Sequence, residues 1–127
     1  MVDYNKLMEM AKEASTNAYC KYSNFKVGAC VLTTSGKTFK GCNFENSSYG
    51  LAICAERCAV GAAIVNGESK IDAIASYSPN TANCYPCGAC RQVLNEFKNE
   101  DLDVITEENG ELKVTKLSYL LPESFTL

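Results

Sequence analysis

Apolar residues recur along the chain with two periods, and the change of period predicts the order of the elements. Spacings of three and four residues predict a helix from residue 3 to about 18, with Asp3 as its N-cap. Alternating small and β-branched residues then predict two strands, 25–34 and 38–44, joined as a hairpin by a polar turn. A polar segment, 43–50, separates this hairpin from the next helical pattern.

The second half of the chain continues the alternation of helical and strand patterns. Gly67 follows one helical pattern and suits a helix C-cap, and Pro86 suits the start of another. The resulting order, α-β-β-α-β-α-β-β, predicts a mixed sheet with helices packed on it. The elements of this half are expected at 54–67, 71–77, 86–99, 102–106 and 112–114, with a final turn at 117–121.

Length and composition predict one domain, 1–127, with a single core. Hydrophobic residues make up 46% and charged residues 21% of the chain, as in ordinary globular proteins. Lys and Arg number 12 against 15 Asp and Glu, so there is no basic stripe to bind a nucleic acid backbone or an acidic membrane. We see neither an apolar export signal nor an apolar run of membrane-spanning length, and expect a cytoplasmic protein that acts on a small molecule.

Eight cysteines and no histidine restrict the possible chemistry. Without an export signal, the cysteines are expected to be reduced thiols that either bind metal or fill the core. The lack of histidine excludes an imidazole base and a His-ligated metal. Acid–base chemistry must therefore use a carboxylate, a Lys, a Tyr, a thiol or a metal-bound water.

Two short cysteine motifs begin the two later helices. Cys87 and Cys90, in the run Pro-Cys-Gly-Ala-Cys-Arg-Gln, are three residues apart and lie on one side of a first helical turn. Free N–H groups of a first turn favour negative charge, here thiolate. Cys54, in the run Cys-Ala-Glu-Arg, is the best candidate to complete the site. The sequence therefore predicts that two helix starts share one zinc ion.

Three interpretations of the cysteine cluster compete. An iron–sulfur set built on Cys84, Cys87 and Cys90 needs a further nearby cysteine, and none follows Cys90. A closed structural zinc site with Cys84 as fourth ligand leaves Glu56 without a task. In the third interpretation, Cys54, Cys87 and Cys90 hold zinc and leave a fourth position open for water, as in a catalytic site.

The open site gives a role to the residues that follow Cys54. Glu56, two residues later, can reach the water without binding the metal and can carry its proton to a substrate. Three thiolates leave the complex negative, so Arg57, with Arg91 as a second candidate, is expected to compensate the charge. The alternative for Arg57 is a surface salt bridge.

The two cysteine motifs resemble those of the zinc nucleobase deaminases. Further segments make the chain similar, nearly from end to end, to the small free-nucleoside cytidine deaminases, whose first metal ligand is also cysteine. The segments that carry this resemblance are Tyr22-Ser23-Asn24-Phe25-Lys26-Val27-Gly28-Ala29, Asn43-Phe44-Glu45-Asn46 and Leu120-Leu121-Pro122 with Phe125.

The resemblance implies a fold, an activity and an assembly. The fold is an α/β class, three-layer α/β/α sandwich with a mixed five-stranded sheet. The activity is deamination of cytidine and deoxycytidine to uridine and deoxyuridine in pyrimidine salvage, with one Zn²⁺ per chain. Glu56 passes protons to ring nitrogen 3 and then to the departing ammonia. The assembly is a homotetramer with shared active sites.

The resemblance also implies substrate contacts. Asn43 and Glu45 match residues that bind the ribose, and Phe25 matches one that packs against the substrate. The backbone of Ala55, with that of Cys87, matches groups that bind the base edge. Phe125 matches an aromatic residue that reaches a neighbouring subunit's ligand, and Tyr49 is placed at a subunit boundary. By composition alone, 43–46 would be a polar loop, and both phenylalanines ordinary core.

Two rival functions remain open at this point. A blasticidin-type deaminase shares the zinc motif, although Asn43-x-Glu45 followed by Ser48-Tyr49-Gly50 favours a nucleoside ribose. A non-catalytic domain folded around structural zinc is the rival from another class. The five remaining cysteines are expected to be small buried residues, with Cys84 a candidate for the pocket mouth: Cys20, Cys30, Cys42, Cys58 and Cys84.

Overall fold

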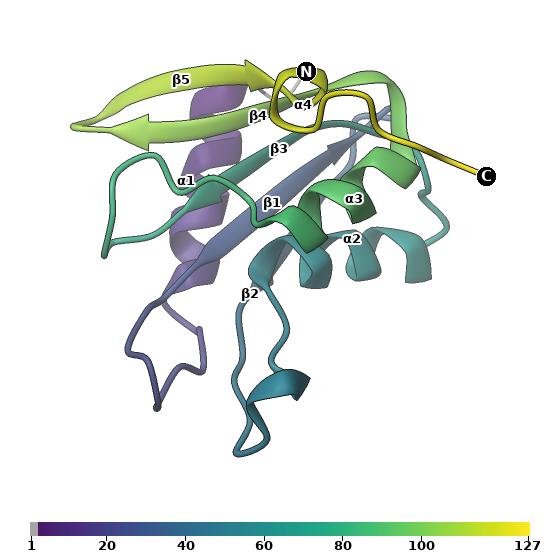
Figure 1. Cartoon of the computed structure of the whole chain (residues 1–127). Helices are drawn as coiled ribbons and strands as arrows, with labels where there is room; N and C mark the ends of the chain where they lie inside the picture. The colour runs from purple at the N-terminus through teal and green to yellow at the C-terminus, as the bar shows by residue number, and fades with distance from the viewer. Residues whose placement is uncertain (1–2) are drawn as a thin grey trace.

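The computed structural model describes residues 3–127, which form one five-stranded sheet with helices on both of its faces (Figure 1). The strands lie in the order β2-β1-β3-β4-β5; β3 and β4 are parallel, and the other neighbours are antiparallel. In chain order the elements are α1 (Tyr4–Ser15), β1 (Gly28–Thr33), β2 (Thr38–Cys42), a short 3-10 turn η1 (Tyr49–Leu51), α2 (Ala55–Val65), β3 (Ile71–Tyr77), α3 (Gly88–Phe97), β4 (Lys98–Glu108), β5 (Glu111–Lys116) and α4 (Leu117–Leu120).

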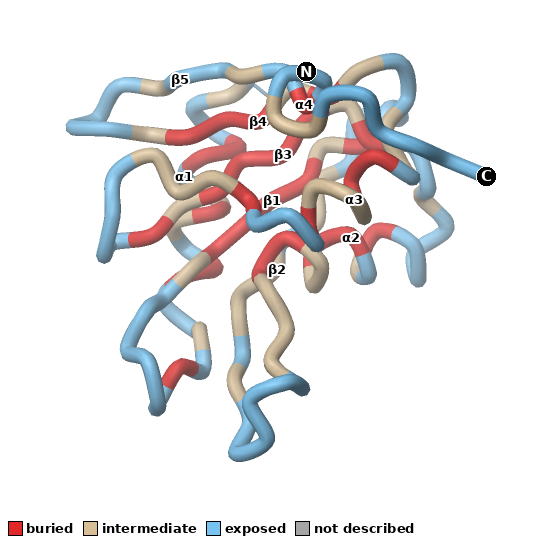
Figure 2. Tube along the Cα trace, viewed as in Figure 1, coloured by how far each residue is buried: buried red, intermediate tan, exposed pale blue. Residues whose placement is uncertain are grey.

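The sheet separates two apolar cores, one for each helical layer. Helix α1 covers one face, where Leu7 and Met8 pack against Ala73 and Ile105. Helices α2 and α3 lie together on the other face, as Figure 1 shows, and their core is larger. Figure 2 shows the buried residues concentrated along the strands and the inner sides of these helices. The predicted three-layer α/β/α sandwich with a mixed five-stranded sheet is confirmed.

Small residues let helix α2 lie close to the sheet. Ala55, Ala59 and Ala63, four residues apart, form its fully buried stripe. Opposite them, Gly41 of β2 has room for no side chain: a Cβ there would lie 2.4 Å from the backbone nitrogen of Ala59 and 2.5 Å from the Ala55 oxygen. This close approach fixes the height at which the first turn of α2 stands above the sheet.

The structure shifts several predicted boundaries. Helix α1 ends at Ser15 instead of about 18, although Asp3 is its N-cap as predicted and accepts a hydrogen bond from the Lys6 N–H over 2.8 Å. Strand β1 begins at Gly28, not at 25, because Asn24 has a left-handed backbone conformation (φ 57°) that interrupts the extended chain before it. Strand β4 begins at Lys98, directly after α3, and is longer than the predicted 102–106.

Between residues 3 and 127, none of the helices is both long and apolar enough to span a bilayer.

Candidate metal centre and active-site cavity

The candidate metal ligands sit at the starts of two neighbouring helices. Cys54 is the N-cap of α2, Cys87 is the N-cap of α3, and Cys90 lies in the first turn of α3. Pro86 immediately precedes the N-cap instead of opening the helix itself. Neither N-cap thiol bonds to the N–H groups of its own helix. Both helix starts therefore direct their partial positive charge toward the thiol cluster.

The spacing of the three thiols fits a tetrahedral zinc ion. The Sγ atoms of Cys54 and Cys87 are 3.8 Å apart, those of Cys87 and Cys90 are 3.5 Å apart, and all three lie within 4.8 Å of one another. Ligands held at the usual Zn–S bond length in a tetrahedron are separated by about 3.8 Å. The donor set is three thiols that form no disulfide. The cluster is thus suited to Zn²⁺ and leaves one tetrahedral position without a protein ligand.

The electrostatics of the cluster favour thiolate at Cys54. Its pKa is lowered to about 5, first by the neighbouring Cys90 thiol and then by Arg57, whose Nη2 donates to Cys54 Sγ over 3.6 Å. The Cys54 contact and burial conversely raise the pKa of Cys90, so the Cys90 thiol keeps its proton. Binding of a metal ion by all three sulfurs must release that proton.

Of the two predicted cations, only Arg57 faces the thiols. Arg91 donates from Nε to the Pro86 carbonyl over 2.7 Å and from Nη1 to the Leu120 carbonyl over 3.0 Å. It therefore joins the start of α3 to the C-terminal helix α4. Contrary to our expectation, its guanidinium bonds to these two carbonyl oxygens and does not face the metal site.

Glu56 lies beside the thiols in a nearly dry position. Its side chain is 4% exposed, and Ser76 Oγ lies 3.4 Å from Glu56 Oε2. Burial raises the pKa of the Glu56 carboxyl to about 7, whereas Ser76 and Arg57 act in the opposite direction. A carboxyl with a pKa near neutrality can both accept and donate a proton, which is what acid–base catalysis requires.

A cavity of about 280 Å³ opens onto Glu56 and two of the thiols. Its apolar wall includes the ring of Phe25, which is 39% exposed, and Ala55 lies at its floor, fully buried at the start of α2. Asn43 and Glu45 contribute polar groups to the same cavity. Seven predicted site residues therefore line one cavity, and Cys90 is grouped with two of them: Phe25, Asn43, Glu45, Cys54, Ala55, Glu56 and Cys87.

The Asn43 side chain holds the loop that carries Phe25. Asn43 Oδ1 accepts the Val27 N–H over 2.9 Å, and Nδ2 donates to the Phe25 carbonyl over 2.8 Å. The amide thus pairs with backbone just before β1 begins. One of its N–H groups remains for a ligand.

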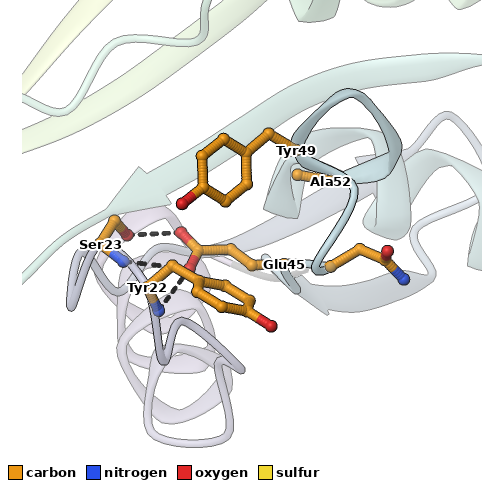
Figure 3. A pocket seen from close by; sticks show the side chains of 6 residues that line it. Tyr22, Ser23, Glu45, Tyr49 and Ala52 are labelled. Carbon is orange, nitrogen blue, oxygen red and sulfur yellow. Dashed lines mark hydrogen bonds between the residues drawn. The ribbon is translucent and has the colours of Figure 1, made fainter.

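Glu45 bonds to the segment before Phe25, at Tyr22 and Ser23. Its carboxylate accepts the backbone N–H groups of Tyr22 and Ser23, each over 3.1 Å, and the Ser23 hydroxyl. These bonds, the Ser23 hydroxyl first, lower the pKa of Glu45. Figure 3 shows the carboxylate turned toward Ser23 and the backbone of Tyr22, with Tyr49 on its other side. Glu45 is therefore an ionised acceptor at neutral pH.

Tyr49 and Phe125 lie outside this cavity. Tyr49 is 76% exposed and lines a second cavity of about 300 Å³ with Tyr22, against whose ring it packs edge-on at 5.8 Å. The Phe125 ring is 67% exposed, and its carbonyl accepts side-chain N–H groups of Gln92 and Asn95 on α3. Within one chain, neither aromatic ring reaches the metal centre.

Two further residues lie near Glu56: Cys84, which was a candidate for the pocket mouth, and Ser76, which received no role in the sequence prediction. Cys84 lines the cavity but is not grouped with the other three thiols among the described residues, which does not favour a closed four-thiolate site. Ser76 comes from β3, where alternation with Ile74 places it on the face toward α2. The signal that could have identified Ser76 in the sequence is a hydroxyl residue at a position where an apolar strand is expected to be buried.

Comparisons with known proteins agree with this geometry. Residues 1–106 match the family model described as the cytidine and deoxycytidylate deaminase zinc-binding region. A cytidine deaminase of Sporosarcina psychrophila is 40% identical over 126 residues, which cover 98% of this chain and 93% of the relative.

A crystal structure of cytidine deaminase from Burkholderia pseudomallei superposes with a TM-score of 0.91 at 44% identity, covering 98% of this chain and 100% of that one. A blasticidin-S deaminase of Bacillus cereus is more distant, at 30% identity over 94% of this chain and 90% of its own.

Proposed function

This chain belongs to the cytidine and deoxycytidylate deaminase zinc-binding family, and we propose that its three-thiol site deaminates both free cytidine and free deoxycytidine, with release of ammonia. The observation that carries the proposal is the position of Glu56, buried beside an incomplete tetrahedron of thiols at the floor of a cavity. A purely structural zinc site needs neither the cavity nor the carboxylate.

The proposed chemistry assigns one task to each group. Cys54, Cys87 and Cys90 would hold Zn²⁺, which would supply the Lewis acid that activates water. Glu56 would transfer one proton of that water to ring nitrogen 3 and the second to the amino group, which leaves as ammonia as the water oxygen takes its place on the ring. Arg57 balances the charge of the thiolates by its bond to Cys54.

The substrate is held by the wall of the cavity. Phe25 packs against the nucleoside, and the free N–H of Asn43 and the carboxylate of Glu45 bind a sugar hydroxyl as donor and acceptor. Backbone groups of Ala55 and Cys87 bind the edge of the base. Because no group specific for the 2′-hydroxyl is evident among residues 3–127, we expect cytidine and deoxycytidine to be accepted alike.

The exposed aromatic residues suit an assembly. We propose that residues 1–127 form one deaminase domain that assembles as a cytoplasmic homotetramer with shared active sites, acting in pyrimidine salvage. In that assembly Tyr49 lies at a subunit boundary and Phe125 reaches a neighbouring site. Their exposure and their distance from their own cavity support this role.

The test combines ultraviolet absorbance of cytidine and deoxycytidine with zinc determination on the same sample. We expect turnover of both nucleosides with one zinc per chain. Glu56→Gln should keep the zinc and lower kcat by about 10²-fold or more. Glu96→Gln, an exposed position on α3, is the matched control and should change nothing.

Three outcomes would contradict parts of the proposal. Tightly bound zinc without turnover of any substrate would indicate a structural domain. Turnover of blasticidin alone would favour the more distant relative's activity. Turnover of only one of the two nucleosides would refute the expected acceptance of both sugars.

A further inference from the structure

Ser76 occupies a position in β3 where the fold requires burial. The residue is fully buried and pairs with Ala29 of the neighbouring strand β1. Side chains alternate along a strand, so Ser76 shares its face with Ile74, which belongs to the core under α2 and α3. An apolar side chain is the expected occupant of such a position. Its hydroxyl must therefore find a partner inside the protein.

The partner is the Glu56 carboxylate. Ser76 Oγ lies 3.4 Å from Glu56 Oε2, and among the described residues no other side chain hydrogen-bonds to that carboxylate. The remaining contact is with the backbone N–H of Glu56 itself. A buried carboxyl with so few partners is free to rotate about its terminal torsion unless one bond fixes it. Ser76 supplies that bond from the rigid sheet.

The Ser76 hydroxyl is left to donate to that carboxylate. Among the described residues, the hydrogen bond of Ser76 Oγ is the one to Glu56 Oε2, and Cys84 lines the same cavity as Glu56. Burial raises the pKa of Cys84 to about 11, so this thiol stays neutral at neutral pH. An ionised carboxylate can only accept a hydrogen bond, so the hydroxyl proton is directed to Glu56 Oε2.

We propose that Ser76 is a positioning residue for the reaction: its hydroxyl, held on the rigid sheet, fixes Glu56 Oε2 and so leaves Glu56 Oε1 to act on the reacting water. This inference rests on the proposed function. It assigns Ser76 no contact with substrate or metal. The loss of such a supporting bond is expected to slow the chemical step and leave substrate binding intact.

The experiment compares zinc-loaded wild type, Ser76→Ala and Ser15→Ala. Ser15 is a matched control because it is also buried but bonds only to the Lys12 carbonyl, in α1 on the opposite face of the sheet. Ser76→Ala should lower kcat by roughly tenfold with KM unchanged, and Ser15→Ala should leave both unchanged. Equal kcat for Ser76→Ala and wild type, or a rise in KM with kcat intact, would overturn the inference.

Two further measurements distinguish positioning from a structural effect. In a Glu56→Gln background, Ser76→Ala should change the residual rate by less than about twofold, because the two residues act as a unit. A full tenfold loss there would overturn the inference. The infrared difference spectrum between wild type and Glu56→Gln isolates the Glu56 carboxyl band, which Ser76→Ala should shift and Ser15→Ala should not.

The infrared shift does not depend on turnover. If zinc-loaded wild type fails to deaminate cytidine, the proposed function fails while the Ser76 contact is still tested. If wild type is active and the band does not move, the positioning role fails alone.

Discussion

The guanidinium of Arg57 donates a hydrogen bond to Cys54 Sγ over 3.6 Å, from the first turn of the helix that Cys54 caps. The bond joins a candidate metal ligand to a cation on the same rigid element. The positive charge of Arg57 thereby offsets the negative charge of three thiolates, and Arg57 takes up none of the four coordination positions of the metal. Arg57 Nε is buried without a partner in the described part of the chain, whereas Nη2 donates to Cys54 Sγ.

Removal of this cation should weaken the metal site. Arg57→Ala is expected to lower zinc affinity by about tenfold, as is usual for partners that support metal ligands. Competition with a chromophoric chelator measures this directly. Arg57→Lys keeps the charge and should retain more of the affinity than alanine. Equal zinc affinity in Arg57→Ala and wild type would show that the helix N-termini alone are enough to offset the charge of the thiolates.

A methyl group at Gly41 should disturb the site from a distance. Gly41→Ala places its Cβ against the backbone of Ala55 and Ala59, neither of which can rotate away. We expect the free energy of unfolding to fall by about 1–3 kcal/mol or more, and kcat to fall because the turn carrying Glu56 is displaced. Denaturant unfolding and the deamination assay measure the two effects.

The control for Gly41 lies on helix α2 itself. Gly61 is exposed, and a Cβ there meets nothing within 4 Å. Gly61→Ala should raise the free energy of unfolding by roughly 0.5–1 kcal/mol, because alanine is the better helix former. Equal free energies of unfolding for Gly41→Ala and Gly61→Ala would show that the contact between α2 and β2 leaves room for a methyl group.

The order of the elements and the thiol cluster were predictable because both follow from local spacing, whereas the three-layer sandwich with five strands was implied by the family resemblance. Period-two and period-3.6 patterns identified the elements, and the three-residue interval between Cys87 and Cys90 places two sulfurs on one side of a helix start. Cys54 is distant in sequence, yet it could be paired with them because it also begins an apolar helix. Capping positions are a local property, so the sequence contained this information.

The surroundings of the cluster were less predictable because they depend on contacts between loops. Nothing periodic indicates that Asn43 bonds to the backbone of Phe25 and Val27, or that Glu45 bonds to Ser23. These contacts also explain why β1 begins later than expected. The role of Asn43 and Glu45 therefore rested on family resemblance, and so did those of Tyr49 and Phe125, which stay predictions for the assembly.

The amide of Asn43 should be required for substrate binding through the loop that it holds. Asn43→Asp keeps the acceptor for Val27 N–H but sets a carboxylate oxygen against the Phe25 carbonyl, where Nδ2 now donates. The repulsion should displace Phe25 and raise KM by roughly tenfold, since an unpaired polar group costs about 1–3 kcal/mol. Steady-state kinetics with cytidine provide the measurement.

The same substitution at Asn80 tests the specificity of that effect. Asn80 Oδ1 accepts the Lys26 N–H over 3.0 Å, a bond that aspartate can also make. Asn80→Asp should therefore leave KM within about twofold of wild type. A comparable rise in KM at both positions would mean that added negative charge, and not the lost donor, is responsible.

The hydrogen bond between Tyr4 and Asp103 should make stability depend on alkaline pH. Tyr4 donates to Asp103 Oδ2 over 2.6 Å, and burial together with this carboxylate raises the pKa of Tyr4 to about 12 from its ordinary value of 10.0. Because the folded pKa is the higher one, this contribution is fully present below pH 10 and is lost as the pH rises from 10 to 12. Tyr4→Phe removes the titrating group and should cost roughly 1 kcal/mol at pH 8. Denaturant unfolding of both proteins across this range should show the wild-type advantage shrinking above pH 10, whereas a constant difference up to pH 12 would mean that Tyr4 titrates alike in the folded and unfolded chains.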